Sequence, residues 1–205
     1  MKSTSFERFG GLCAILAGII IFLYSVAFIV IARSAPGLAG LLSALFLMLS
    51  GLLSTAGLVA LYLRLRETDA AFALWALLLT LAGGLGSAIH GGYDLANAIN
   101  PPDANLPGLA DLPSQIDPRG LLTFGVAGVG LFVVAWLIRR GAQFPNGLGY
   151  LSYVLAALLV ILYLGRLIVL RASSPVILVP AVLAGFLANP IWYIWLGITL
   201  LGERK

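Results

Sequence analysis

The polar residues best suited to chemistry lie near the end of one long apolar segment, in the run AIHGGYDLAN. His90, Asp94 and Asn97 are spaced by four and then three residues, so on a helix they share one face. An imidazole beside a carboxylate can take up and release a proton near neutral pH, and His90 is the only histidine in the chain. The spacing therefore predicts a polar site in which His90 responds to protons.

Neighbouring segments place further polar groups at the same depth. Arg119 begins the fourth apolar segment, and Thr123 follows one turn deeper. Arg166 lies near the end of the fifth segment, with Tyr163 one turn below it. Guanidinium groups bind carboxylates and phosphates through paired donors, so the two arginines indicate an anion-binding pocket. The alternative is that each arginine extends separately to lipid head groups and that His90 only joins two helices.

The sixth segment contains the pair Asn189-Pro190 near its middle. A proline inside a helix leaves one backbone carbonyl without its usual donor, which can bend the helix and open a small cavity. Asn189 either faces such a cavity or bonds across to the third segment. The candidate ligand-binding residues are therefore His90, Asp94, Asn97, Arg119, Thr123, Tyr163, Arg166 and Asn189.

The elements that must position these residues are six apolar stretches in a chain that is 61% hydrophobic and 10% charged. Each has the roughly 20 residues that a helix needs to cross a bilayer core. We expect an all-α, polytopic membrane protein. It would form a six-transmembrane-helix bundle in a single integral membrane domain over residues 1–205, with spans at 9–32, 37–63, 70–95, 119–139, 146–170 and 175–201.

The distribution of lysine and arginine predicts the orientation of the bundle. Eight of the twelve basic residues lie on the side shared by both termini. Because basic residues concentrate on the cytoplasmic side, both termini are expected in the cytoplasm, with the protein in the cell (plasma) membrane. The longest connection, 99–118, contains five prolines and is therefore expected outside, as an extended outer loop over the bundle or as a simple connector.

Small residues indicate which face of the third span points inward. Gly83, Ser87 and Gly91 recur every four residues on the same face as His90. Lipid penalises polar side chains, and small residues allow close helix packing, so this face should look into the bundle. A similar ridge starts at Ala181 in the last span, which predicts that the third and sixth helices form a tightly packed centre.

The residue inventory excludes several function classes. Both lysines lie at the termini, which rules out a retinal-type Schiff base, and one histidine with one cysteine rules out bis-histidine haem, His-rich zinc and CxxC redox sites. The basic residues are dispersed, so no nucleic-acid partner is expected, and no cofactor is predicted.

A non-enzymatic protein is the leading interpretation. It would bind a small ligand that is amphiphilic or anionic, with the arginines holding the anionic group. Alternatively, it would bind a protein partner, either a second copy of itself or another membrane protein. One alternative is a small intramembrane enzyme that acts on a lipid or isoprenoid, because HGGYD fits an H-x-x-x-D pattern in which a histidine base works beside an aspartate. A proton-coupled exporter is the third possibility.

Overall fold

The computed structural model of the protein describes residues 4–100, 117–169 and 174–202. Every regular element in this part of the chain is helical. Six helices are long and apolar enough to cross a membrane, which confirms the predicted six-helix bundle: Ser5–Arg33, Pro36–Leu65, Ala70–Ile99, Leu121–Arg140, Asn146–Ile168 and Pro175–Leu201. Most of the proline-rich connection lies outside the described residues, so its expected path over the bundle stays a prediction.

Three of the six spans are not continuous α-helices, because each contains a π-helical segment. The first consists of α1 (Ser5–Ser25), the π-helix η1 (Val26–Val30) and a short 3₁₀ turn (Ile31–Arg33). The second, third and fifth are α2 (Pro36–Leu65), α3 (Ala70–Ile99) and α6 (Asn146–Ile168). The fourth joins the turn η3 (Pro118–Gly120), the π-helix η4 (Leu121–Val126) and α5 (Ala127–Arg140), and the sixth joins α7 (Pro175–Leu183), the π-helix η5 (Ala184–Ala188) and α8 (Asn189–Leu201).

Local sequence signals explain where several helices begin. The Thr4 hydroxyl accepts from the Glu7 backbone N–H, and the Glu7 carboxylate accepts from the Thr4 N–H, which forms a capping box at the start of α1. Asp69 caps α3 through the backbone N–H of Phe72. Pro36 and Pro175 stand in the first turns of α2 and α7, where a missing backbone donor costs little.

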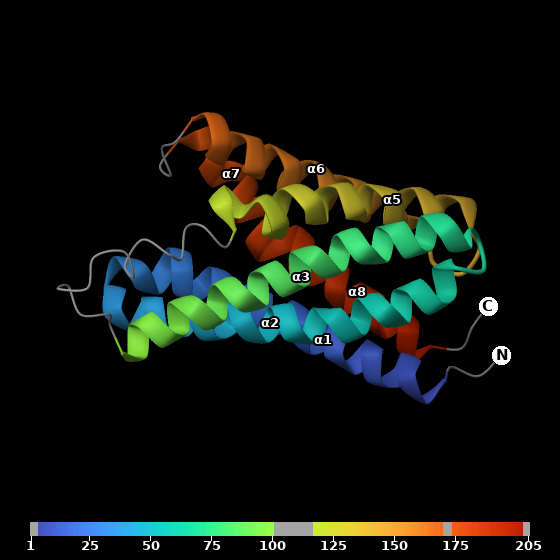
Figure 1. Ribbon diagram of the computed structural model, residues 1–205, viewed down its shortest axis with the longest axis horizontal. Coiled ribbons are helices and arrows are strands. Elements are labelled where there is room, and N and C mark those ends of the chain that lie inside the picture. Colours follow the sequence, from blue (N-terminus) through green and yellow to red (C-terminus); the bar gives the residue numbers. More distant parts are fainter. Residues whose placement is uncertain (1–3, 101–116, 170–173, 203–205) are drawn as a thin grey trace.

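The six spans form a closed ring in chain order. Each span packs on the next, and α8 closes the ring by packing on α1. The first and last described helices start and finish at the same end of the bundle, which we call the terminus end; the opposite end is the loop end (Figure 1). The two ends differ in packing because the sixth span changes neighbours along its length. At the loop end α7 packs on α6, whereas towards the terminus end α8 packs on α1, α2 and α6.

Glycines set the closest helix contacts. A Cβ atom at Gly91 of α3 would lie 2.7 Å from the carbonyl oxygen of Ala44 and 2.9 Å from the Cα of Met48 on α2. On α1, a Cβ at Gly11 would lie 3.0 Å from the carbonyl oxygen of Gly197 on α8. The third span thus packs closely on the second and fourth, and the sixth on the first. The expected central pair of the third and sixth spans is wrong, because α8 fits between α1 and α6 instead.

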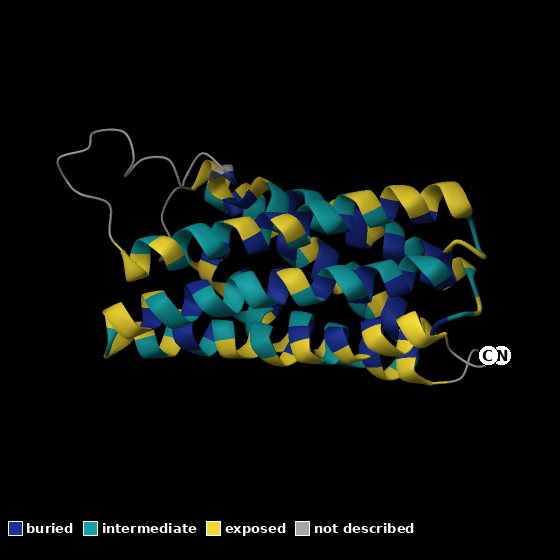
Figure 2. Ribbon diagram, turned by 60° about the horizontal axis from the view of Figure 1, so that its bottom comes forward, coloured by how far each residue is buried: buried dark blue, intermediate teal, exposed yellow. Residues whose placement is uncertain are grey.

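Large apolar side chains are exposed along the outer face of every span. Figure 2 shows exposed residues on the outside of the bundle and buried residues within it. Such surfaces are unfavourable in water and are what a lipid-facing helix requires. The exposed set includes Leu12, Phe28, Leu52, Leu78, Phe132, Val154, Ile161, Leu178 and Ile198.

A buried ion pair holds the terminus end together. Arg64 Nε lies 3.1 Å from Glu7 Oε1, and the two side chains are 1% and 0% exposed. The remaining Arg64 nitrogens donate to backbone carbonyl oxygens near the C-terminus of α8, at 3.0 Å to Thr199, 3.0 Å to Leu200 and 3.3 Å to Gly202. One guanidinium therefore binds the first, second and sixth spans at once. Neither residue stands out in the sequence, because Arg64 and Glu7 lie at the ends of two separate apolar segments.

We predict that Arg64→Met destabilises the protein far more than Arg66→Met, two residues along the same chain. Removing one partner of a buried pair leaves an uncompensated charge, at a cost of about 3–5 kcal/mol, whereas Arg66 is exposed. Unfolding in mixed micelles measures the difference. The double variant Glu7→Gln/Arg64→Met should lose less free energy of unfolding than the sum of the losses in the two single variants. Equal stability of the two arginine variants would contradict the role of Arg64 in joining the three spans.

Gly91→Ala and Gly92→Ala should have different effects on stability. Alanine favours a helix over glycine by about 0.8–1 kcal/mol. A Cβ at Gly92 makes only ordinary contact, 3.6 Å from the Met48 sulfur, whereas one at Gly91 meets the α2 backbone. We expect Gly92→Ala to be neutral or stabilising and Gly91→Ala to lower the melting temperature in detergent. A harmless Gly91→Ala would mean that α2 and α3 lie further apart.

Candidate functional site

A cavity of about 560 Å³ lies between the helices in the loop half of the bundle, and all six spans contribute to its wall. Of the residues predicted from sequence, those that line it are His90, Asp94, Arg119, Thr123, Arg166 and Asn189. Asn97 lies beyond Asp94 near the end of α3 and does not line it. Tyr163 also does not line the cavity. Its ring packs against Gly125 on η4, where an added Cβ atom would lie 3.0 Å from the ring.

The cavity passes the midpoints of α2 and α3 and ends before the terminus end of the bundle. Thr80, one of its deepest residues, is ten residues into α3, roughly 15 Å from the start of the helix at 1.5 Å per residue. Beyond this depth the interior is filled by buried apolar side chains. These include Leu61, Leu65, Val134, Leu137, Ile138, Leu148, Leu155, Trp192, Leu196 and Leu200. The Nε1 of Trp192 donates to Ser152 at 2.7 Å, so the polar atom within this core is satisfied.

The polar edge of α3 looks into the cavity. His90 Nε2 lies 3.2 Å from Asp94 Oδ2 one turn further along α3, and the side chains are 31% and 45% exposed. Ser87, one turn deeper, donates to the Gly83 carbonyl at 3.0 Å and lies 3.5 Å from the Thr123 hydroxyl on η4. The third and fourth spans therefore present a continuous polar strip along one wall.

Asp117 organises the start of the fourth span. Its carboxylate accepts from the Leu122 N–H at 2.7 Å, the Thr123 N–H at 3.2 Å and the Thr123 hydroxyl at 2.6 Å, and it is 3% exposed. A carboxylate at a helix N-terminus satisfies backbone donors that have no helical partner. Asp117 was not among the residues predicted from sequence, although an acidic residue just before an apolar run is a typical signal for the start of a helix.

The two arginines meet at the loop end of the cavity. Arg119 donates to the backbone carbonyl of Arg166 at 3.2 Å, and the Arg166 guanidinium lies over the Phe124 ring, 5.3 Å from its centroid. Arg119 has a φ of 58° and Gly120 a φ of 80°, so the chain turns sharply here through the left-handed region. Within the described residues, neither guanidinium forms an ion pair with a carboxylate.

Hydroxyl groups supply most of the remaining polarity. Each donates to a carbonyl three or four residues earlier in its own helix, which satisfies its hydrogen and leaves its lone pairs free to accept. The wall thus offers donors at the two guanidiniums and acceptors further in. The hydroxyl residues that behave this way are Ser25, Ser43, Ser50, Ser54, Thr80 and Ser87.

All three π-helical segments of the described chain border this cavity. Phe28 belongs to η1, Thr123 to η4 and Gly185 to η5. A π-helical turn widens a helix locally, and such turns are frequent at functional sites. Asn189 directly follows η5 and lines the cavity, but it forms no hydrogen bond to α3 among the described residues. Of the two alternatives for Asn189, the position on a cavity wall is therefore the one seen in the described residues, and the bond to the third helix is not.

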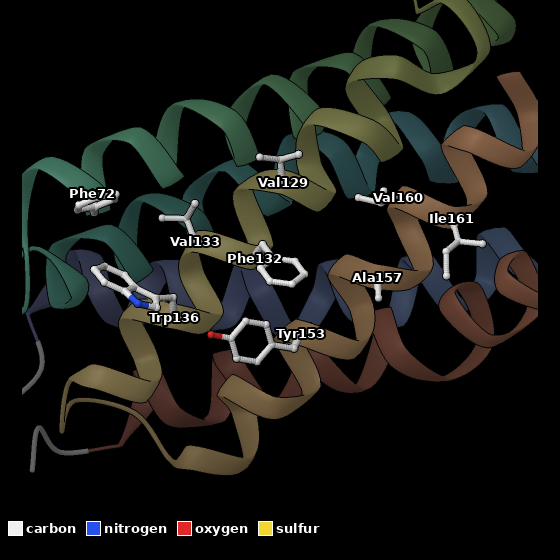
Figure 3. Close-up of a pocket in the computed structure, with 9 residues that line it drawn as sticks. All are labelled: Phe72, Val129, Phe132, Val133, Trp136, Tyr153, Ala157, Val160 and Ile161. Carbon is white, nitrogen blue, oxygen red and sulfur yellow. The ribbon is translucent and has the colours of Figure 1, made fainter.

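A second cavity, of about 720 Å³, differs in character. It is a groove on the outer surface of α5 and α6, edged by Phe72 of α3 (Figure 3). Its lining is apolar and aromatic, and the Phe132 and Tyr153 rings lie edge to face with centroids 5.0 Å apart. A lipid chain can cover such a surface without a polar partner, so we place the candidate site in the interhelical cavity.

Comparison with known proteins gives no match to a family model, to a curated protein or to a solved structure. The functional argument therefore rests on the residues of the cavity.

We predict that Asp117→Ala destabilises the protein more than Asp94→Ala. The first change leaves the start of η4 without its acceptor, at roughly 1–3 kcal/mol, while the second removes a partly exposed pair worth about 0.2–1 kcal/mol. Thermal unfolding in detergent compares the two, and Asp117→Asn, which keeps one acceptor oxygen, should fall between them. A larger loss at Asp94 would contradict the assigned capping role.

Proposed function

We propose that the protein binds a small amphiphile with an anionic group in the cavity at the loop end of the bundle. The residues proposed to form the site are His90, Asp94, Arg119, Thr123, Arg166 and Asn189. We further propose, from the bias of basic residues, that both termini are cytoplasmic and that the cavity belongs to the outer half of the plasma membrane.

The observation that carries the proposal is the pair of arginines at the cavity wall, neither of which forms an ion pair with a carboxylate of residues 4–100, 117–169 or 174–202. Charges at membrane depth are costly and usually paired. Asp117, the nearest buried carboxylate in sequence, already accepts three hydrogen bonds from η4, and Asp94 lies beside His90. With respect to the described part of the chain, Arg119 and Arg166 therefore keep donors that an anion could occupy.

The size and lining of the cavity support an amphiphile rather than an inorganic ion. A volume of about 560 Å³ lies within the range of small-molecule sites. Beneath the arginines the wall alternates hydroxyls with apolar side chains such as Leu47, Leu131 and Leu162. Such a surface suits an alkyl chain with a few polar substituents, while the guanidiniums hold the head.

Binding of decyl phosphate, with decanol as the uncharged comparison, tests the proposal. Loss of one charge-assisted contact costs about 1.5–3 kcal/mol, which is roughly 10- to 100-fold in affinity. We expect Arg119→Gln and Arg166→Gln each to weaken decyl phosphate binding by that factor, measured by calorimetry in detergent. Arg33→Gln is the matched control, because Arg33 is exposed near the same end and does not line the cavity. Absence of decyl phosphate binding, or equal loss in all three variants, would overturn the proposal.

A further inference from the structure

The ring of spans has one weak seam, between the first and sixth spans at the loop end. Among the described residues, η1 packs extensively only on its own span and on α2, while α7 packs extensively only on α6 and η5. Every other neighbouring pair of spans stays in contact in this half. The seam arises because the sixth span changes neighbours along its length: α7 packs on α6, whereas α8 packs on α1.

Specific contacts mark where the seam begins. Phe22 and Phe186 pack edge to face with centroids 5.7 Å apart, and Ser25 meets the backbone at Gly185. On the terminus side of these contacts, α1 and α8 pack closely, as at Gly18, where a Cβ would lie 2.8 Å from the carbonyl oxygen of Pro190. The two spans are therefore joined in one half and separate in the other.

The cavity reaches the outer surface along this seam. Phe28 on η1 and Leu178 on α7 both line the cavity, yet they are 59% and 44% exposed. Both belong to apolar, membrane-spanning helices, so the medium outside the seam is the hydrocarbon of the bilayer. A molecule that moved through the seam would pass from lipid directly to the wall that carries Arg166.

We infer that the ligand is a membrane lipid with a phosphate monoester head group, which enters sideways from the bilayer between the first and sixth spans. This inference rests on the proposed function and adds the ligand class and the route. The seam is apolar at its edges and suits acyl chains, while the two guanidiniums beyond it match the several acceptor oxygens of a phosphate. The chains remain in the seam and the head group lies between η3, η4 and the end of α6.

The head group alone and the intact lipid separate the two sources of phosphate. The probes are phosphatidic acid, diacylglycerol with the same chains, and water-soluble glycerol 3-phosphate, each added to the full-length protein in nanodiscs or detergent. We expect phosphatidic acid to bind at least 10-fold more tightly than either other probe and to require Arg166.

A bulky side chain in the seam tests the route. Ala181 lines the cavity on α7, whereas Val179 on the same helix is exposed and does not line it. We expect Ala181→Trp to slow uptake of phosphatidic acid from vesicles at least 10-fold and Val179→Trp to leave it unchanged. Phe28→Ala, which widens the seam, should speed uptake, so the route remains testable if the tryptophan variant does not fold.

The outcomes distinguish this inference from the function on which it rests. Decyl phosphate binding that depends on the arginines, together with phosphatidic acid that binds no better than glycerol 3-phosphate, would overturn the lipid assignment and leave the anion site intact. Uptake unaffected by Ala181→Trp and Phe28→Ala would overturn the route. Failure of every phosphate probe would overturn both proposals.

Discussion

The buried contact between Arg64 and Glu7 determines how the two halves of the bundle differ. The guanidinium bonds to a carboxylate on α1 and to three carbonyl oxygens near the end of α8, so the first, second and sixth spans must converge at the terminus end. Close glycine contacts between α1 and α8 continue this convergence to the middle of the bundle. Among the described residues, the loop half shows no comparable packing between α7 and η1, and the cavity has its loop-end part there.

The same arrangement explains how polar groups are tolerated in an apolar bundle. The hydroxyls that line the cavity bond to their own helices, Asp117 bonds to the start of η4, and His90 lies beside Asp94. Each group is thus satisfied locally, which a low-dielectric interior requires. In the described residues the arginine pair keeps several donors without acceptors, and the proposed anion would supply those acceptors.

Much of the architecture could be predicted from sequence because hydropathy and length depend on local composition. The six spans and the inward-facing edge of α3 follow from apolar runs and from the spacing of His90, Asp94 and Ser87. What could not be predicted depends on distant pairing: Arg64 lies far from Glu7 in sequence, and nothing in either segment indicates the partner. The π-helical turns also have no clear sequence signal, so the widening of three spans around one cavity, and the position of Asn189 within it, required the structure. Asn97 and Tyr163 share the periodicity of the lining residues but lie outside the cavity, because Asn97 is near the end of α3, beyond Asp94, and the Tyr163 ring packs against Gly125.

Accessibility of the cavity floor to a water-soluble thiol reagent tests this account most directly. In a Cys13→Ala background, Asn189→Cys would place a thiol on the cavity wall and Leu196→Cys one in the fully buried core seven residues further along the same helix. The account predicts that the reagent labels Asn189→Cys only when it is applied from the loop end and that it does not label Leu196→Cys from either end. Labelling of Leu196→Cys, or labelling of Asn189→Cys from the terminus end, would contradict a cavity that lies on the loop side of a closed core.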